Sequence, residues 1–500
     1  MSSNLMKFLK TKKYGILIST MFFVLSYSPE SLSNDSNLKK NQFNTFKKVS
    51  FSNKEILLTD KNLVELIEKY NLKLINSKLN ITQNKLLLKS ELSAWYPKLN
   101  LSSNGLPKYI DGYTYNSPSS SLNTLSRQIT TSLNAEVKWD IINPLRKPEI
   151  ISAKKNLKKA KLNYLVNLKD IELDAIEKFY FLQQAQEELK VAKKSLQYSK
   201  VLLNEAKINF DSGIGTKLEL LEAKTQFLRD KKLVSQAIGD KKIKRRNLLN
   251  IINHPKEDVI LKLPQPQAYG IWDYSLKESI KESYKYSKKL EINKIDQSIN
   301  NIDAKKALAL KKPTISIFNT FSSNFNRGQS LVSSPNMDAK SSVISNTIGL
   351  SATWNIIDGG KAKSLYKYNK SKTNESQNKA QMVMNNLKKD VERFFFKLET
   401  EMNNIITTKQ EVESSNESLR LARLRFQSGI STQREVVNNQ RDLTDAQYNF
   451  LKSVTNYNIY ISKLKRLTGI TQIDSCDSIK KKLITSKINK EFLDVICKNN

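Results

Sequence analysis

The chain repeats its own features at a spacing of about 216 residues, and this duplication restricts its fold more than any other property. The segment 210–216 reads Phe-Asp-Ser-Gly-Ile-Gly-Thr and returns at 426–432 as Phe-Gln-Ser-Gly-Ile-Ser-Thr. Pro97 returns in the same way as Pro313. A repeat of this length is a duplicated half of a domain rather than a short solenoid unit. The sequence therefore predicts an internal two-fold repeat, each half having a helix, two strands and two very long helices.

The net charge is strongly positive, at +35 over 500 residues. Such a balance is common in proteins that bind nucleic acid or an anionic membrane. The lysines are spread along the predicted helices rather than gathered in one arm, which favours a solvated basic surface. A basic coiled-coil protein that binds nucleic acid remains an alternative, but such a protein should carry no export signal.

The first 33 residues have the organisation of a secretory signal peptide. Four lysines between Lys7 and Lys13 precede an apolar run from Tyr14 to Tyr27, and small and polar residues follow. The run is short for a membrane span, although an uncleaved anchor is an alternative. No other stretch reaches about 18 uninterrupted apolar residues, so any membrane-embedded part must consist of β-strands.

Two stretches of alternating polarity follow the proline in each half. They span 98–106 and 128–142 in the first half, and 314–324 and 343–357 in the second, with a long polar loop between the members of each pair. Strands of about 9–11 residues with weak alternation are typical of transmembrane β-barrels, although a soluble hairpin has the same pattern. Each half is therefore expected to contribute two strands.

Helical periodicity covers most of the remaining sequence. One helix is expected from Lys54 to Trp95, ending before the proline,. A heptad seam then begins at Leu182 and alternates large residues with small ones such as Ala185,. A single helix over 147–209 would be about 95 Å long, which suits a rod, a stalk or the wall of a tube.

A glycine follows the first long helix of each half and predicts a hairpin turn. Gly213 and Gly429 suit the left-handed conformation that ends many helices,. Thr216 and Thr432 come three residues later and are expected to cap the helices that follow,. Each half should therefore contain a long helical hairpin whose turn lies at the end of the rod.

Four candidate membrane strands per chain are too few to close a barrel. An open strand edge in lipid would leave backbone groups without hydrogen-bond partners. The strands must therefore be shared between copies of the chain, and three copies would give twelve strands while four would give sixteen. The long hairpins of the same copies would pack into a helical cylinder, so the sequence predicts a continuous conduit.

Residues 54–470 resemble the TolC family of outer membrane channels, which serve multidrug efflux and type I secretion. The resemblance rests on the order of the repeat, the proline-initiated strands, the strand end 354–360 and both Phe-x-x-Gly-x-x-Thr turns. It implies a homotrimer that is a mixed α/β membrane protein, with a shared twelve-stranded barrel and a periplasmic α-helical barrel of coiled-coil helices. It also implies passive export of substrates to the exterior, assisted by a periplasmic adaptor protein and an inner-membrane transporter of the ABC, RND or MFS type.

The resemblance assigns gating and selectivity roles to residues beyond the turns. Glu435 and Asn438 match acidic positions that narrow the periplasmic entrance and favour cations in the family, although Asn438 departs from the acidic pattern. Glu219 and Glu222 hold the equivalent places in the first repeat, and Arg434 could pair with an acidic neighbour to hold the entrance closed. A ring of carboxylates is a known selectivity device, but glutamate also suits any helix N-terminus.

The turns themselves match the hairpin tips that meet the adaptor in this family. The matching residues are Gly213, Ile214, Thr216, Gly429, Ile430 and Thr432. A glycine that only ends a helix would explain part of the same pattern, and the two roles are compatible.

The sequence lacks the marks of an enzyme. His254 is the only histidine and lies beside Pro255, so a histidine metal site or a Ser-His-Asp triad would depend on it,. There is no phosphate-binding loop, dinucleotide-binding glycine motif or Cys-x-x-Cys pair, so no catalytic residue, metal or cofactor is expected. Cys476 and Cys497 could form a disulfide or remain free,.

The predicted organisation has six parts. They are a signal peptide (1–33), a polar segment (34–53), the first repeat (54–255), a linker (256–274), the second repeat (275–470) and a Lys-rich tail (471–500). An exported coiled-coil stalk or adhesin without a pore is the alternative, and it explains the heptads but not the paired strands. The transported substrate is not readable, because the pump would select it.

Overall fold

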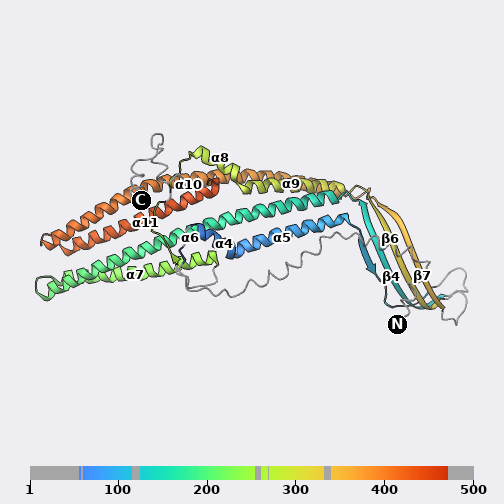
Figure 1. Cartoon of the computed structure of the whole chain (residues 1–500), viewed down its shortest axis with the longest axis horizontal. Coiled ribbons are helices and arrows are strands. Elements are labelled where there is room, and N and C mark those ends of the chain that lie inside the picture. The colour runs from blue at the N-terminus through green and yellow to red at the C-terminus, as the bar shows by residue number, and fades with distance from the viewer. Residues whose placement is uncertain are drawn as a thin grey trace. The chain divides into compact units, whose positions relative to one another are not determined.

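The computed structural model describes residues 56–57, 60–114, 124–253, 261–268, 270–330 and 339–470. The predicted signal peptide, the polar segment 34–53, His254 and the tail with its two cysteines lie outside these ranges. The helices and the main sheet belong to one unit, Leu57–Asn500, which is described here by itself (Figure 1).

The described elements fall into two series along the chain. The first half contains β1 (Ile56–Leu57), α4 (Asp60–Tyr70), α5 (Leu72–Leu92), the 3-10 helix η2 (Ser93–Trp95), β2 (Lys98–Ser102), β3 (Lys108–Thr114), β4 (Thr124–Ile142), α6 (Arg146–Asp211) and α7 (Lys217–Ile252). The second half follows β5 (Leu261–Lys262) and contains α8 (Leu276–Tyr286), α9 (Lys288–Ala309), β6 (Thr314–Ser330), β7 (Ala339–Thr353), α10 (Lys361–Gln427) and α11 (Gln433–Thr468).

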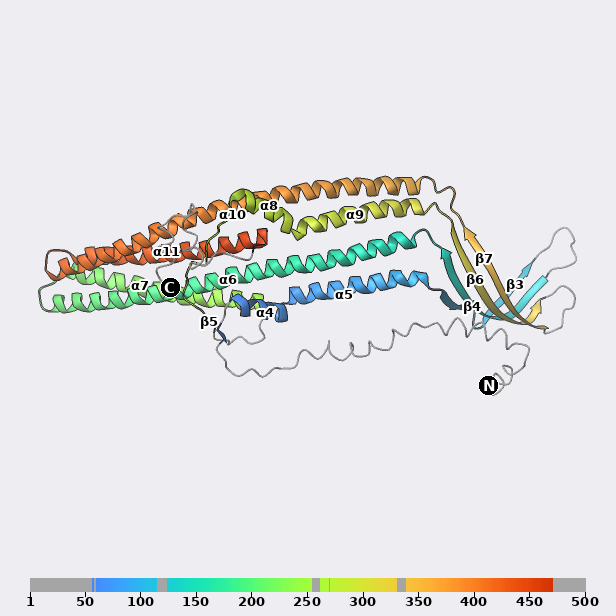
Figure 2. The ribbon, with the colours of Figure 1, turned by 45° about the horizontal axis from the view of Figure 1, so that its top comes forward.

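Two very long helices, α6 and α10, dominate the structure, with 66 and 67 residues. They confirm the helix predicted over 147–209 and its counterpart in the second half. Each turns back into a 36-residue partner, α7 or α11, so each half contains a helical hairpin (Figure 2). The small members of the predicted seam in α6 are all buried, which lets the neighbouring helices approach closely: Ala185, Ala192, Ser199 and Ala206,.

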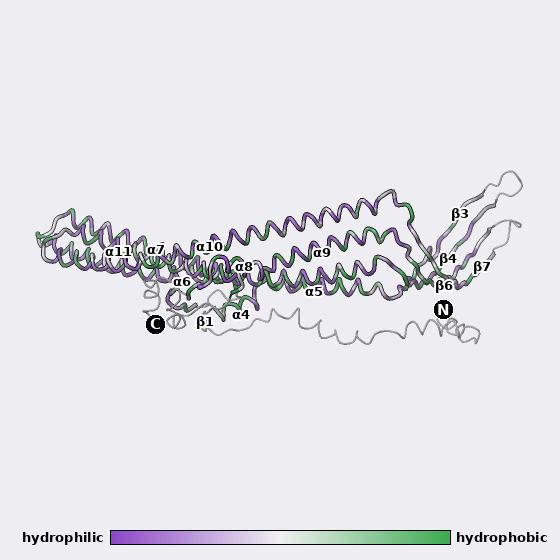
Figure 3. The backbone as a smooth tube through the Cα atoms, turned by 90° about the horizontal axis from the view of Figure 1, so that it is seen from above, coloured by the Kyte–Doolittle hydropathy of each residue, from purple (hydrophilic) through white to green (hydrophobic). Residues whose placement is uncertain are grey.

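Apolar residues are spread along the helices rather than gathered in one place (Figure 3). One cluster surrounds Tyr457 and Leu464 of α11 and includes Trp272 from the connecting segment. A second cluster, nearer the turns, joins Leu202 of α6 to Leu419 of α10 and to the start of α11. Each fully buried leucine contributes about 1.5–3 kcal/mol relative to an exposed one. No helix within the described ranges is long and apolar enough to cross a membrane.

The N-terminal helical region departs from the prediction. The single helix expected over 54–95 is wrong, because Asn71 separates α4 from α5 with an extended backbone at ψ 117°. The Asn71 side chain accepts a hydrogen bond from the Leu74 amide at 3.2 Å and donates to the Ile251 carbonyl of α7 at 2.6 Å. The break is therefore fixed by a contact about 180 residues away, which periodicity alone does not reveal.

The main sheet has five antiparallel strands that occupy four positions. The order is β2-β4-β6-β7, and β3 pairs with β4 beyond β2. The prediction of one strand over 98–106 is therefore wrong, since the chain leaves β4 after Ser102 and returns at Lys108. Within the described residues, β2 and β3 pair only with β4, and β7 pairs only with β6.

The two faces of this sheet differ in polarity. Directly paired residues share a face, so the register assigns each side chain to one side. One face carries most of the apolar residues: Leu99, Leu101, Ile129, Leu133, Val137, Trp139, Ile315, Ile317, Phe321, Phe325, Ile344, Ile348 and Leu350. The other face is mainly polar: Asn100, Ser102, Gln128, Thr130, Ser132, Asn134, Glu136, Ser316, Thr320, Ser322, Asn324, Ser345 and Thr347.

Strand-end tryptophans link the sheet to the helices that precede it. In the first half the Trp139 indole donates to the Trp95 carbonyl at 3.0 Å, and in the second half the Trp354 indole donates to the Lys311 carbonyl at 2.9 Å. The strand predicted to reach 357 ends earlier, at Thr353, so Trp354 lies just outside it. The two bonds still join corresponding positions of the duplicated sequence.

Candidate functional site

The two hairpin turns have the same backbone geometry. Gly213 and Gly429 both have positive φ values, 76° and 73°, which a residue with a side chain rarely adopts,. Their amides donate to the carbonyls of Phe210 and Phe426 at 3.0 Å, so each helix ends in the same way. The glycines predicted from the sequence are thus required by the conformation of the turn.

An exposed isoleucine projects from each turn. The side chains of Ile214 and Ile430 are 83% and 72% exposed. Their amides are nevertheless held, since each donates to a carbonyl of the preceding helix at 2.9 Å. The position of each isoleucine is therefore fixed while its apolar surface remains available.

The helix after the first turn begins with a capping box. The Thr216 hydroxyl accepts the Glu219 amide at 3.2 Å, and the Glu219 carboxylate accepts the Thr216 amide at 2.9 Å. The prediction that Thr216 caps α7 is confirmed. Glu219 is therefore engaged at the helix start, where two otherwise unpaired amides are satisfied by one reciprocal contact.

The second turn uses its glutamate differently. Thr432 occupies the predicted N-cap position of α11, but its side chain accepts no capping hydrogen bond. The Glu435 carboxylate instead accepts from the Arg425 guanidinium at 2.9 Å and from the Ser431 hydroxyl. The first repeat has Asn209 and Gly215 in the places of Arg425 and Ser431, so it lacks both donors.

An ion pair joins the two hairpins close to their turns. The Arg434 guanidinium of α11 donates from Nε at 3.0 Å and from Nη2 at 2.5 Å to one oxygen of Glu222 in α7. The Arg434 side chain is 68% exposed and that of Glu222 is 23% exposed. Asn438 lies one helical turn beyond Arg434 and is also exposed. The candidate residues Glu222, Arg434 and Asn438 therefore belong to one region between α7 and α11.

Further polar contacts connect the two hairpins near this ion pair. Gln433 of α11 donates to the Leu202 carbonyl of α6 at 3.4 Å, and its side chain is buried. Arg441 of α11 donates to the Gln226 side chain of α7 at 3.4 Å. Sequence reasoning did not identify these residues, because polar side chains that face another hairpin show no period of their own.

Asp230 is a buried carboxylate within the same contact region. It is only 4% exposed, and Gln226 donates to one of its oxygens at 3.0 Å. The other oxygen has no hydrogen-bond partner among the described residues. Asp230 comes three residues after Phe227, at the seam position that Ala223 and Ala237 occupy in the adjacent heptads. An acidic residue in that small-residue series was the signal that could have identified it.

Burial raises the pKa values of two groups in this region, Asp230 and Tyr448. Burial raises the pKa of Asp230, while the nearby polar side chains of Ser199, Ser195 and Gln226 and the charge of Arg441 oppose the rise. Burial, together with the nearby carboxylates, also raises the pKa of Tyr448 in α11 to about 12. Among the described residues no group of three His, Cys, Asp or Glu side chains could hold a metal ion. The site therefore offers fixed charges and hydrogen bonds at a helical junction.

Comparison with protein families gives one match that covers most of the helices and strands. The family model described as Outer membrane efflux protein matches residues 65–254 and 318–470. A search of curated protein sequences gives no significant match. Both hairpin turns, and all the candidate residues near them, fall within the matched ranges.

Several solved structures have a similar fold. The Campylobacter jejuni CmeC outer membrane channel has a TM-score of 0.69 at 15% identity, covering 89% of this chain and 95% of its own. A membrane protein from Pseudomonas aeruginosa has a TM-score of 0.68 at 14% identity, covering 84% and 98%. The outer membrane protein VceC from Vibrio cholerae has a TM-score of 0.66 at 12% identity, covering 82% and 96%. At these identities the likeness concerns the fold.

Proposed function

The chain belongs to the outer membrane efflux protein family, and we infer from this membership that it is an outer membrane channel for the export of substrates. Its role is passive conduction from the periplasm or an inner-membrane pump to the exterior. The family match includes the strands as well as the hairpins, which argues against a stalk or adhesin without a pore. Transport by such a channel involves no catalytic chemistry, consistent with the absence of catalytic motifs from the sequence.

The observation that carries the proposal is the two-faced sheet with an unpaired strand at each side. Within the described residues, β2 and β3 lie at one edge and β7 at the other. In lipid each edge needs a partner strand, because unpaired amides and carbonyls are costly there. Three chains, each supplying four strand positions, would close a twelve-stranded barrel with the apolar face towards lipid and the polar face towards the lumen.

The helical hairpins supply the second part of the proposed conduit. Three copies of α6–α7 and α10–α11 would form a periplasmic α-helical barrel that continues from the β-barrel. The matching tryptophan bonds and the matching turns support an internal two-fold repeat. The repeats would span 54–255 and 275–470, joined by the linker 256–274.

The hairpin turns would form the periplasmic end of the conduit. Glu219, Glu222, Arg434, Glu435 and Asn438 would then surround the entrance, and the Arg434–Glu222 ion pair would help to hold it closed. The three Glu435 carboxylates would favour cations, as charged rings do in other channels. The proposal is supported by the position of these residues beside the turns.

The same turns are proposed to contact a periplasmic adaptor protein. The exposed side chains of Ile214 and Ile430, held on ordered backbone, provide an apolar contact at each tip. The adaptor would connect the channel to an inner-membrane transporter of the ABC, RND or MFS type, for efflux or for type I secretion.

The direct test is conduction by the purified protein. The protein is isolated from the outer membrane fraction, reconstituted into planar lipid bilayers and recorded at several voltages. Discrete conductance steps that persist across independent insertions are the expected result. Complete electrical silence of correctly folded, outer-membrane-derived protein, including variants of the entrance pair, would contradict the channel proposal.

A further inference from the structure

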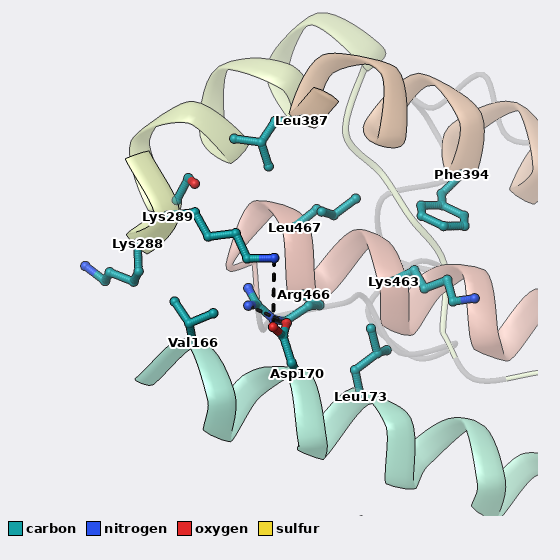
Figure 4. A pocket seen from close by; sticks show the side chains of 11 residues that line it. Val166, Asp170, Leu173, Lys288, Lys289, Leu387, Phe394, Lys463, Arg466 and Leu467 are labelled. Carbon is teal, nitrogen blue, oxygen red and sulfur yellow. Dashed lines mark hydrogen bonds and ion pairs between the residues drawn. The ribbon is translucent and has the colours of Figure 1, made fainter. Parts of the chain in front are cut away.

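A cavity of about 150 Å³ lies where four helices of the two halves meet, away from the hairpin turns. Its walls come from α6, from the start of α9, from α10 and from the last turns of α11 (Figure 4). Leu173, Leu387, Phe394 and Leu467 give it an apolar side. An apolar cavity of this volume is about large enough for one benzene-sized ring.

The other side of the cavity is charged. Arg466 donates from Nη2 at 2.7 Å and from Nε at 3.0 Å to a single oxygen of Asp170. The Lys289 ammonium lies 3.9 Å from the second oxygen of Asp170, beyond hydrogen-bond distance. In Figure 4, Lys289 points into the space above Asp170, whereas Lys288 points away from it. Lys289 therefore has donors available to a second acceptor inside the cavity.

The local charge balance favours one additional anion. Lys289 and Arg466 carry two positive charges, and Asp170 supplies one negative charge between them. A second carboxylate would neutralise this group, and each guanidinium or ammonium hydrogen bond to it would be charge-assisted. The Lys463 ammonium, at the far end of the cavity, is already paired with Glu177 at 3.1 Å.

We propose that this cavity is a binding site for a small aromatic monocarboxylate. The ring lies against Leu387, Phe394 and Leu467, and the carboxylate accepts hydrogen bonds from Lys289 and Arg466. Phe394 contributes an aromatic surface to the ring site, with the preferred offset or edge contacts of such pairs. This site goes beyond the proposed channel function and does not depend on it.

Binding at this place would stabilise the junction between the two halves. The residues that contact the ligand come from α6, α9, α10 and α11, which are distant in sequence. A ligand that binds only the folded arrangement raises the apparent stability, and the increase grows with the logarithm of the free ligand concentration once that exceeds the dissociation constant. Bound carboxylate is therefore expected to raise the melting temperature of the helical region.

The test uses 4-fluorobenzoate as the probe and fluorine NMR of the detergent-solubilised full-length protein as the measurement. The neutral analogue 4-fluorobenzyl alcohol and inorganic phosphate, at equal ionic strength, test the charge and the ring separately. We expect saturable binding of 4-fluorobenzoate that is at least about tenfold tighter than that of the alcohol, since charged hydrogen bonds are the stronger class. Phosphate should compete weakly.

Two matched lysine variants make the site assignment specific. Lys289→Met should weaken 4-fluorobenzoate binding by about tenfold, while Lys288→Met, with the same charge change on the same helix turn, should leave it within about twofold. Leu387→Phe, which fills the apolar side, should abolish binding while circular dichroism shows an unchanged fold. Absence of saturable binding to the wild-type protein, equal losses in both lysine variants, or phosphate binding as tightly as the probe would each overturn the proposal.

Discussion

Arg434 of α11 and Glu222 of α7 form an ion pair that connects the second hairpin to the first, 2.5 Å from Nη2 to Oε1. The residues are 212 positions apart and lie beside turns that the duplicated sequence places at the same end of the helices. The pair thus links the two hairpins through positions that are not equivalent in the repeat, since Glu222 corresponds to Asn438. In the proposed channel this contact lies at the periplasmic entrance.

Arg434→Gln should make the entrance easier to open. The Arg434 side chain is largely exposed, so the ion pair is expected to stabilise the closed entrance by about 0.2–1 kcal/mol. That energy corresponds to an increase in open probability of roughly 1.4-fold to fivefold per pair, measured in planar bilayers. Glu222→Gln should have an effect of the same sign.

Arg420→Gln is the matched control for this prediction. Arg420 pairs with Glu417 at 2.6 Å within α10, three residues apart, and joins no second hairpin. Its replacement should leave the open probability unchanged. Equal opening by the Arg420 and Arg434 variants would show that general surface charge, rather than the link between hairpins, controls the entrance.

Glu435 and Arg425 should alter ion selectivity in opposite directions. Glu435→Gln removes a carboxylate and should lower the preference for cations, because a ring of negative charge would lose its members. Arg425→Gln removes the cation that lies 2.9 Å from that carboxylate and should raise the preference. Reversal potentials under a salt gradient report both effects. Shifts in the same direction, or no shift for Glu435→Gln, would exclude Glu435 from the selectivity ring.

Gly429→Val should destabilise the second hairpin turn. The φ of Gly429 is +73°, and a side chain in that region costs about 1–2 kcal/mol even though no atom lies within 4 Å of the added Cβ,. Urea unfolding followed by far-UV circular dichroism measures the loss. Gly239→Ala, inside α7 and equally free of contacts, should instead stabilise by about 0.5–1 kcal/mol,. Tolerance of valine at 429 would contradict the conformational requirement.

Asp230→Asn should stabilise the protein at neutral pH and less so in acid. The pKa of Asp230 is raised above its ordinary value of 3.8, so folding favours the protonated form. Its contribution to stability is therefore most favourable below pH 3.8 and is lost as pH rises through the folded pKa,. The variant removes that penalty and should gain about 1 kcal/mol at neutral pH.

The exposed Asp240 of the same helix provides the comparison for this effect. Asp240→Asn should change the free energy of unfolding by less than about 0.5 kcal/mol. Denaturation at neutral pH and below pH 3.8 distinguishes the two positions. A gain for Asp230→Asn that does not shrink as pH falls would show that ionisation is not its cause.

The sequence predicted the elements that depend on regular spacing. The heptads from Leu182 onwards define α6, and the glycines at 213 and 429 mark turns whose φ values are positive. The alternating stretches identified β4, β6 and β7, although β7 ends at Thr353 rather than at 357. These features are local, and each follows from a period or from a backbone requirement.

The features that sequence reasoning missed depend on distant partners. Asn71 breaks the first helix and donates to the carbonyl of Ile251. The Glu435 carboxylate is held by Arg425 and Ser431 rather than by the amide of Thr432. The identity of the partner of Arg434 required the packing of α11 against α7. A period within one element carries no information about the register between two elements.

The central claim is that the chain supplies four strand positions to a barrel shared by three chains. The most direct measurement is the mass of the mature protein in detergent, by light scattering corrected for bound detergent. A mass of three chains is predicted, because the sheet edges at β2–β3 and at β7 then pair with neighbouring copies. A stable monomer, with both edges of its sheet unpaired, would contradict the account.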